Sequence, residues 1–192
     1  QNLIGYNEKE MQQIRGQGIA MVFQDPQSTL NPTMTVGSQI EEAILLHEKA
    51  LKQKKERKLF EKNKKKSARE QSITLMELVG IKDAEQRYDL YPYHFSGGMR
   101  QRCVLATALA SNPRILIADE PTTALDVTIQ AEILQLLKKL QKELNLSILF
   151  ITHDLGVVAQ IADRVAVMQD GNIVELEEAK QLFTAPKHSY TK

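Results

Sequence analysis

The chain of 192 residues is long enough for one domain with a substantial core, or for a domain plus a small subdomain. Its apolar fraction of 42% and its net charge of +1 exclude a disordered chain and give the whole molecule no electrostatic bias toward nucleic acid. The only cysteine is Cys103, which excludes a disulfide framework and a multi-cysteine metal site. Because we find neither a signal peptide nor an apolar run near the roughly 20 residues of a membrane helix, we expect a cytosolic protein.

Positive charge is concentrated in one Lys-rich stretch. Residues 48–70 carry 11 Lys and Arg against 4 Asp and Glu, whereas the rest of the chain has 14 against 20. The stretch is either a solvated helix or loop, or a segment that contacts anionic lipid, where clustered basic residues gain roughly 1 kcal/mol each. The sequence leaves both interpretations open.

The first half of the chain predicts a buried strand, a loop and two helices. An apolar run over 18–23 ends at Gln24 and is typical of a strand that leads into a loop. Two prolines with Asp, Ser, Thr and Asn between them predict that loop over 25–32. Helical spacing of apolar residues over 36–46, and again over 73–79, predicts the two helices.

The second half predicts strands that alternate with helices. The expected elements are a helix over 99–110, a strand over 115–118, an amphipathic helix over 129–144, a strand over 147–152, a helix over 157–161 and a hairpin over 164–175. Strands separated by helices imply right-handed crossovers and a parallel sheet. We therefore expect an α/β fold.

Two adjacent carboxylates follow the strand over 115–118. We expect that strand to be buried on both faces, which places Asp119 and Glu120 at the carboxyl edge of the sheet, where ligands bind in open α/β folds. One carboxylate there can hold Mg²⁺ while its neighbour polarises an attacking water. The alternative is an ordinary strand end whose acids cap the next helix.

A Ser-Gly-Gly sequence precedes the helix over 99–110. Ser96 can cap this helix, and Gly97 and Gly98 allow the backbone to approach an anion that the helix dipole favours. A simple capped helix after a glycine turn is the alternative. Gln24 and His153 end two other strands, so both can reach a ligand at the same sheet edge, and the Gln24 amide can contact Mg²⁺ or the attacking water.

These segments together resemble the ATP-binding-cassette (ABC) ATPases in their order and spacing. They are Gln24, Ser96-Gly97-Gly98, Asp119-Glu120, Ala124-Leu125-Asp126 and His153. The resemblance implies a P-loop-type parallel sheet core with an inserted helical subdomain. It implies an ATPase core over 1–35 and 100–192 and a helical subdomain over 36–99, which contains the Lys-rich stretch and the signature motif.

The resemblance also implies a role for each of these residues in a site for ATP and Mg²⁺. The residues expected to act in catalysis are Glu120, His153 and Gln24. Those expected to bind nucleotide are Ser96, Gly97, Gly98, Met99 and Asp126. Those expected to bind Mg²⁺ are Asp119 and Gln24. In family terms, Glu120 is the catalytic base, His153 the switch histidine and Asp126 the D-loop aspartate. Two cassettes are expected to face each other, with the signature of one completing the ATP site of the other.

Within the family, the chain resembles the ATP-binding subunits of oligopeptide and dipeptide importers. The resemblance lies in Phe23-Gln24-Asp25-Pro26, in Met99 at a position where most of the family has Gln, and in the tail 185–191. His188-Ser189-Tyr190 departs from the usual His-Pro-Tyr. Closely related importers carry nickel or other small solutes, so nickel is the alternative cargo.

The importer resemblance implies transmembrane permease subunits, a second ABC ATPase subunit and, indirectly, an extracytoplasmic solute-binding protein as partners. Nucleic acid is not expected as a partner, and the location is the cytoplasmic face of the membrane. Cassette ATPases of DNA repair and chromosome organisation are the alternative class. They separate the glutamine loop from the signature by long coiled coils or zinc modules, and this sequence has neither between Gln24 and Ser96.

The phosphate loop of the family, G-x-x-x-x-G-K-[ST], is absent from these 192 residues. Its Lys and Ser or Thr normally hold the phosphates and Mg²⁺. We therefore expect the chain to be the carboxyl-terminal part of a longer protein or an incomplete gene product. The alternative to an active subunit is a catalytically inactive fragment, and the chain alone is expected to be poorly soluble or partly disordered.

Overall fold

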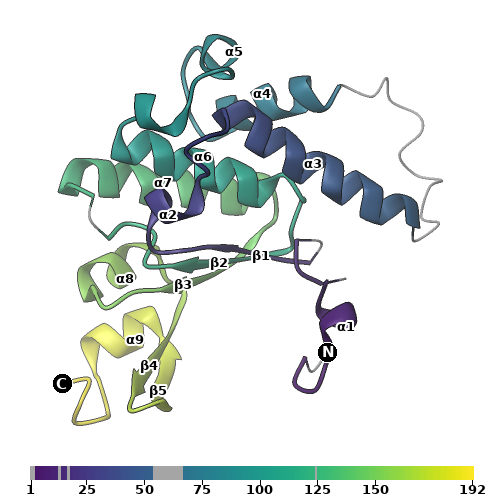
Figure 1. Cartoon of the computed structure of the whole chain (residues 1–192). Helices are drawn as coiled ribbons and strands as arrows, with labels where there is room; N and C mark the ends of the chain where they lie inside the picture. The colour runs from purple at the N-terminus through teal and green to yellow at the C-terminus, as the bar shows by residue number, and fades with distance from the viewer. Residues whose placement is uncertain (1–2, 13, 17, 54–66, 124) are drawn as a thin grey trace. The chain divides into compact units, whose positions relative to one another are not determined.

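The computed structural model describes residues 3–12, 14–16, 18–53, 67–123 and 125–192 (Figure 1). The chain divides into two compact units, Gln1–Leu149 and Phe150–Lys192. Most of the Lys-rich stretch, from 54 to 66, lies outside the described residues, so both interpretations of it stay predictions. The expected division into an ATPase core and a helical subdomain also stays a prediction.

A three-stranded sheet underlies the helices of the first unit, and its last strand crosses the boundary at Leu149. Its strands are β1 (Ile19–Val22), β2 (Ile115–Asp119) and β3 (Ser147–Ile151), in the order β1-β2-β3. β1 and β2 run parallel, with Ile19 opposite Ile115 and Val22 opposite Ala118. Runs of Ile, Val, Leu and Ala suit such strands, because these side chains pack well on a pleated surface. The predicted strands, their parallel pairing and the α/β class are confirmed.

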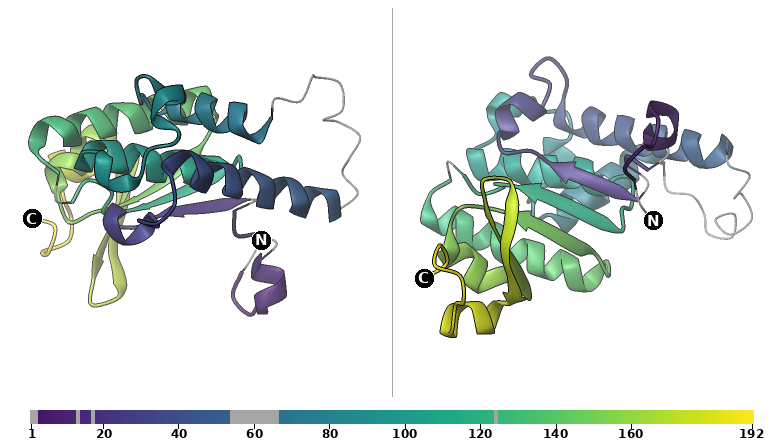
Figure 2. Two further views of the ribbon diagram at one scale, coloured as in Figure 1. Left: turned by 45° about the horizontal axis from the view of Figure 1, so that its top comes forward. Right: turned by 90° about the horizontal axis from the view of Figure 1, so that it is seen from below.

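One face of this sheet is covered and the other is exposed. Ala20, Val22, Leu116 and Ala118 are buried, whereas alternate residues such as Ile115 are 38% exposed. Successive side chains of a strand point to opposite faces, and the large helices of the first unit lie on one side of the sheet (Figures 1 and 2). The expectation that the strand over 115–118 is buried on both faces is therefore wrong.

Four long helices make up most of the first unit. They are α3 (Val36–Gln53), α4 (Ala68–Leu78), α6 (Gly97–Leu109) and α7 (Val127–Glu143). α7 is amphipathic, and its stripe of Ile133, Leu137 and Leu140 is fully buried. α4 begins with a capping box of Ser67 and Glu70, whose side chains each bond to the other residue's backbone N–H. The four predicted helices are confirmed.

Four shorter helices of the first unit were not predicted. They are α1 (Glu8–Gln12), α2 (Pro26–Thr29), α5 (Ala84–Arg87) and the 3-10 helix η1 (Pro92–His94). α2 lies within the predicted loop 25–32 and forms a single turn. Pro26 opens it with a φ already suited to a helix, and the Ser28 and Thr29 hydroxyls both donate to the Asp25 carbonyl at 2.9 Å. Turn-forming residues thus close one helical turn.

The second unit contains α8 (Leu155–Ile161), β4 (Arg164–Gln169), β5 (Asn172–Glu178) and α9 (Ala179–Thr184). β4 and β5 pair in an antiparallel hairpin and form a sheet of their own. Its two-residue turn has φ of 50° at Asp170 and 79° at Gly171, which is the geometry that Asp-Gly favours. The predicted hairpin is confirmed.

Candidate functional site

The carboxyl ends of β1 and β2 bring Gln24 and Glu120 together. The two strands are parallel neighbours, so the residues that follow them leave the sheet at the same edge. The Gln24 amide nitrogen Nε2 donates a hydrogen bond to Glu120 Oε2 at 3.0 Å. Asp119 ends β2 and is partly exposed at this edge. Two residues that lie 96 positions apart in the chain therefore meet at the sheet edge where the sequence predicts both of them.

Glu120 sits in a backbone conformation that favours glycine. Its φ is 44°, in the left-handed region. A turn follows, in which the Thr123 backbone N–H donates to the Glu120 carbonyl at 3.1 Å. Pro121 occupies the first central position of this turn, where its fixed φ is favourable. The turn redirects the chain immediately after β2 and places Thr123 beside the Glu120 carboxylate, to which its Oγ1 donates at 2.8 Å.

Ser96 caps α6 as predicted. Its φ and ψ are −64° and 166°, and its hydroxyl accepts a hydrogen bond from the Met99 N–H at 3.4 Å. The first turn of α6 therefore begins with Gly97 and Gly98, and its dipole favours an anion at this end.

The starts of α6 and α7 lie close together. A Cβ on Gly98 would be 2.5 Å from Ile129 Cγ2, and one on Gly97 would be 3.6 Å from Leu125 Cδ2. Asp126 caps α7 by accepting from the Ile129 N–H at 3.0 Å. The residues expected to form the signature motif and the expected D-loop aspartate thus belong to neighbouring helix starts.

The start of α3 is hydrogen-bonded to the segment that precedes α6. The Gly37 N–H donates to the Tyr88 carbonyl, and the Val36 N–H to the Leu90 carbonyl, both at 2.9 Å. The Tyr88 ring fills the space where a Gly37 side chain would be, since a Cβ there would be 2.2 Å from the ring. Burial and the hydrogen bond that Tyr88 donates to Glu41 raise the pKa of the Tyr88 hydroxyl to about 12. α3 and the segment leading to Ser96 are therefore held together by backbone and side-chain bonds.

His153 belongs to the second unit, where it lies between β3 and α8. The neighbouring Asp154 caps α8, because its Oδ1 accepts from the Gly156 N–H at 2.8 Å and from the Val157 N–H at 3.3 Å. The Asp154 N–H in turn donates to the Thr152 hydroxyl at 3.1 Å. The loop that carries His153 is thus ordered by its own hydrogen bonds, and a role for His153 at the Glu120 edge stays a prediction.

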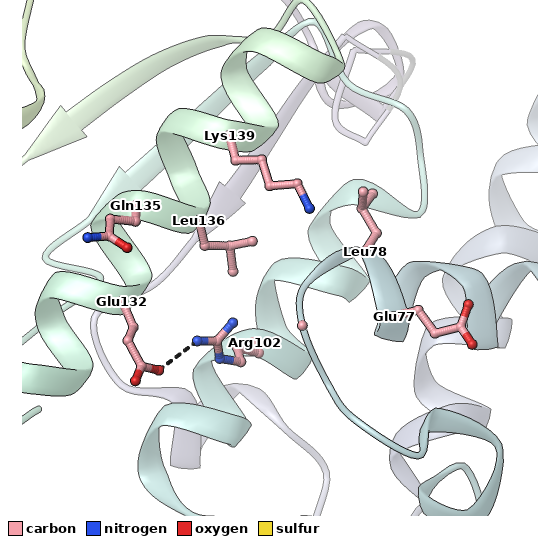
Figure 3. Close-up of a pocket in the computed structure, with 8 residues that line it drawn as sticks. Glu77, Leu78, Arg102, Glu132, Gln135, Leu136 and Lys139 are labelled. Atoms are coloured by element: carbon pink, nitrogen blue, oxygen red, sulfur yellow. Dashed lines mark hydrogen bonds and ion pairs between the residues drawn. The ribbon is translucent and has the colours of Figure 1, made fainter.

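An open hollow of about 300 Å³ lies between α4, α6 and α7, away from the predicted site residues (Figure 3). Arg102 projects into it and donates to Glu132 at 2.9 Å and to the Val79 carbonyl at 2.7 Å. The hollow also contains Glu77 and Lys139, so its charges are mixed. Arg102 joins three segments of the helical layer, and we assign the hollow a structural role.

Oxygen ligands for Mg²⁺ are available at the β1 and β2 edge. The Gln24 amide nitrogen donates to Glu120, so the Gln24 amide oxygen is the atom that suits a metal ion. Asp119, the residue before Glu120, supplies a carboxylate. Within the described residues, no group of three or more His, Cys, Asp and Glu could hold a metal ion. Mg²⁺ in phosphate sites needs only one or two carboxylates, with the remaining ligands from phosphate and water. The residues present fit that kind of site.

Thr123 is the residue of this site that the sequence did not predict. Its position was hidden because a Pro-Thr-Thr sequence indicates only a turn. The signal in the sequence is the spacing, because the fourth residue of a turn that begins at Glu120 comes back close to Glu120.

None of the described helices is both long and apolar enough to cross a lipid bilayer.

Comparison with known proteins adds independent evidence. A family model described as ABC transporter matches residues 2–123. The oligopeptide transport ATP-binding protein OppD of Bacillus subtilis is 55% identical over 190 residues, which are 99% of this chain and 49% of OppD. The dipeptide transport ATP-binding protein DppD of Lactococcus lactis is 51% identical over 190 residues, which are 99% of this chain and 51% of DppD. The chain therefore spans about half the length of these relatives.

Solved structures agree with the sequence relatives. The cbiO1 protein of Clostridium perfringens, part of the ABC transporter complex cbiONQ, superposes with a TM-score of 0.75 at 29% identity, over 95% of this chain and 65% of that one. The dimeric ATP-binding cassette MJ0796 bound to ADP and Pi gives a TM-score of 0.71 at 28% identity, over 91% of this chain and 68% of that one. The family model covers residues 2–123, more than half of the sequence, and the chain belongs to the ABC transporter family.

Proposed function

We propose that the chain is part or all of the ATP-binding and ATP-hydrolysing subunit of an ABC importer for oligopeptides or dipeptides. The observation that carries this proposal is the Glu120 carboxylate, which follows β2 and is held by Gln24 from the end of β1. Identities of 55% and 51% to oligopeptide and dipeptide transport proteins support the peptide cargo.

Glu120 is proposed as the base that orients or deprotonates the attacking water. Water attacks the γ-phosphorus, the bond from that phosphorus to the bridging oxygen breaks, and Glu120 takes the water proton. His153 is proposed to donate a hydrogen bond to the γ-phosphate from the loop after β3. Asp119 and the Gln24 amide oxygen would hold Mg²⁺, which neutralises phosphate charge when it is bound.

Ser96, Gly97, Gly98 and Met99 are proposed to bind nucleotide on a second cassette. The capped start of α6 presents backbone N–H groups and a helix dipole, which suit the γ-phosphate. Asp126 would connect the two sites, because it caps α7 next to that helix start. The MJ0796 relative is a dimer bound to ADP and Pi, which supports a paired arrangement.

The proposed partners are transmembrane permease subunits, a second ABC ATPase subunit and, indirectly, an extracytoplasmic solute-binding protein. The subunit would sit at the cytoplasmic face of the membrane without spanning it. The 192 residues by themselves are expected not to hydrolyse ATP, because they contain no G-x-x-x-x-G-K-[ST] sequence to cradle the phosphates. Activity is therefore tested in the native assembly that contains this chain.

Peptide-stimulated ATP hydrolysis in membrane vesicles tests the cargo. We expect di- to oligopeptides, supplied with the solute-binding protein, to raise the hydrolysis rate and to enter the vesicles. Nickel supplied in the same way should leave the rate unchanged. Stimulation by nickel and not by peptides would contradict the peptide assignment and leave the ATPase assignment intact.

A further inference from the structure

We propose that Thr123 is a positioning residue that fixes the orientation of the Glu120 carboxylate. The inference rests on the proposed role of Glu120 as the base in ATP hydrolysis. The Thr123 hydroxyl Oγ1 donates to Glu120 Oε2 at 2.8 Å, and Gln24 Nε2 donates to the same oxygen at 3.0 Å. One carboxylate oxygen is thus held by a neighbour in the turn and by a residue from another strand.

The two donors constrain different motions of the carboxylate. A single hydrogen bond leaves a glutamate free to rotate about its last side-chain torsion, which has a broad energy profile. A second donor to the same oxygen, coming from another element, fixes the plane of the carboxylate as well as its position. Hydrogen bonds to an ionised acceptor are also about twice as strong as neutral ones. Thr123 therefore contributes an orientation that Gln24 alone does not supply.

The backbone shows that Thr123 is placed for this contact. The turn from Glu120 to Thr123 is closed by the hydrogen bond from the Thr123 N–H to the Glu120 carbonyl at 3.1 Å. Glu120 accepts a φ of 44° within this turn, a conformation that is costly for a residue with a Cβ. The strained backbone and the side-chain bond thus act on the same pair of residues.

Thr123 is partly buried, which limits competition from water. Its bond to Glu120 is itself part-buried, whereas the Gln24 bond is exposed. A nucleotide or metal ion that engages Gln24 can therefore remove the exposed donor while Thr123 keeps its hold. In this arrangement the Gln24 bond to Glu120 is lost when ligand binds, and Thr123 keeps the Glu120 carboxylate oriented both with and without ligand.

The test compares two variants of Thr123 in the native assembly. Thr123→Val keeps the branched shape and removes the hydroxyl, and Thr123→Ser keeps the hydroxyl. We expect Val to lower kcat about 10- to 100-fold with KM for ATP changed less than about threefold, because misplaced catalytic groups cost rate more than binding. Ser should restore kcat to within about threefold of the wild type.

Thr107→Val is the matched control. Thr107 is also partly buried and its hydroxyl donates at 3.0 Å, but to the Cys103 carbonyl within its own helix. The control should keep wild-type kcat and KM. If Thr107→Val and Thr123→Val lower kcat equally, the effect is general to threonine loss and the positioning role is wrong.

A second readout needs no turnover. In the protein without nucleotide, we expect the ¹³C carboxyl signal of Glu120, assigned by its loss in Glu120→Gln, to move or broaden in Thr123→Val and to persist in Thr123→Ser. Identical Glu120 signals in wild type and Thr123→Val would overturn the inference. If Glu120→Gln itself retains hydrolysis, the proposed role of Glu120 fails instead, so the two failures are distinguishable.

Discussion

The two faces of the sheet differ although they are made from the same strands. Leu116 in β2 is fully buried, and Ile115 beside it is 38% exposed. In β1, Val22 is fully buried and Met21 is 38% exposed. We call the exposed side, with Met21, Phe23 and Ile115, the open face. The residue types on the two faces are alike, so the helices that lie on one side alone decide which side chains form the core.

The strand ends that carry Gln24 and Glu120 do not depend on cover for the open face. Their geometry comes from the parallel pairing of β1 and β2 and from the turn after Glu120. Substitutions on the covered face should therefore change the free energy of unfolding, and substitutions on the open face should change the solubility of the chain.

Leu116→Ala should reduce the free energy of unfolding by about 2–5 kcal/mol, since it leaves a cavity under the helices. Ile115→Ala is the matched control from the open face and should cost less than about 1 kcal/mol. Urea unfolding followed by circular dichroism measures both. Equal losses would show that the two faces do not differ as described.

Gly98→Ala should cost about 1–3 kcal/mol, because the new Cβ would lie 2.5 Å from Ile129 Cγ2 and force α6 and α7 apart. Gly97→Ala is the control, since its Cβ would meet Leu125 at an ordinary 3.6 Å. Shortening the neighbour in Gly98→Ala/Ile129→Ala should recover part of the loss. The same unfolding experiment decides, and an additive double variant would argue against the close approach.

Asp126→Ala should cost about 1 kcal/mol, because α7 loses the side chain that accepts from the Ile129 N–H. Asp126→Ser keeps a capping oxygen and should cost only a few tenths of that. Thermal unfolding compares the two variants. A Ser variant as unstable as the Ala variant would show that the carboxylate stabilises the helix start by some route other than capping.

Met21→Ser and Phe23→Ser should change the free energy of unfolding by no more than about 0.5 kcal/mol, because both side chains belong to the open face. The soluble yield of the chain should rise, since each substitution removes exposed apolar surface. Ultracentrifugation of the expressed chain measures the yield. A stability loss like that of Leu116→Ala would mean that the open face is packed.

Local patterns predicted most of the fold and the sheet edge at which Gln24 and Glu120 lie. Helical spacing identified α7, and Asp170-Gly171 identified the hairpin, because each depends on neighbouring residues. The prediction that β2 is buried on both faces was wrong, because the pattern of apolar residues does not show whether a second layer of helices covers a strand. Gln24 and Glu120 were predicted at one edge from parallel strand ends, and the structure places them in contact.

The remaining features depend on three-dimensional detail. The contact of Thr123 with Glu120 arises from a turn whose left-handed residue is not a glycine, so its sequence carries no distinctive mark. The one-turn helix α2 was hidden in loop-forming residues for a similar reason. His153 was predicted from its place after a strand, and its role at the site stays a prediction.

ATP hydrolysis by Glu120→Gln in the native assembly tests the role of Glu120 as the base, with Glu85→Gln as a control from the exposed surface of α5. Loss of the base predicts that hydrolysis falls by about 100-fold or more while ATP binding persists. The control should keep the wild-type rate. Hydrolysis by Glu120→Gln within a few fold of the wild-type rate would show that Glu120 is not the base.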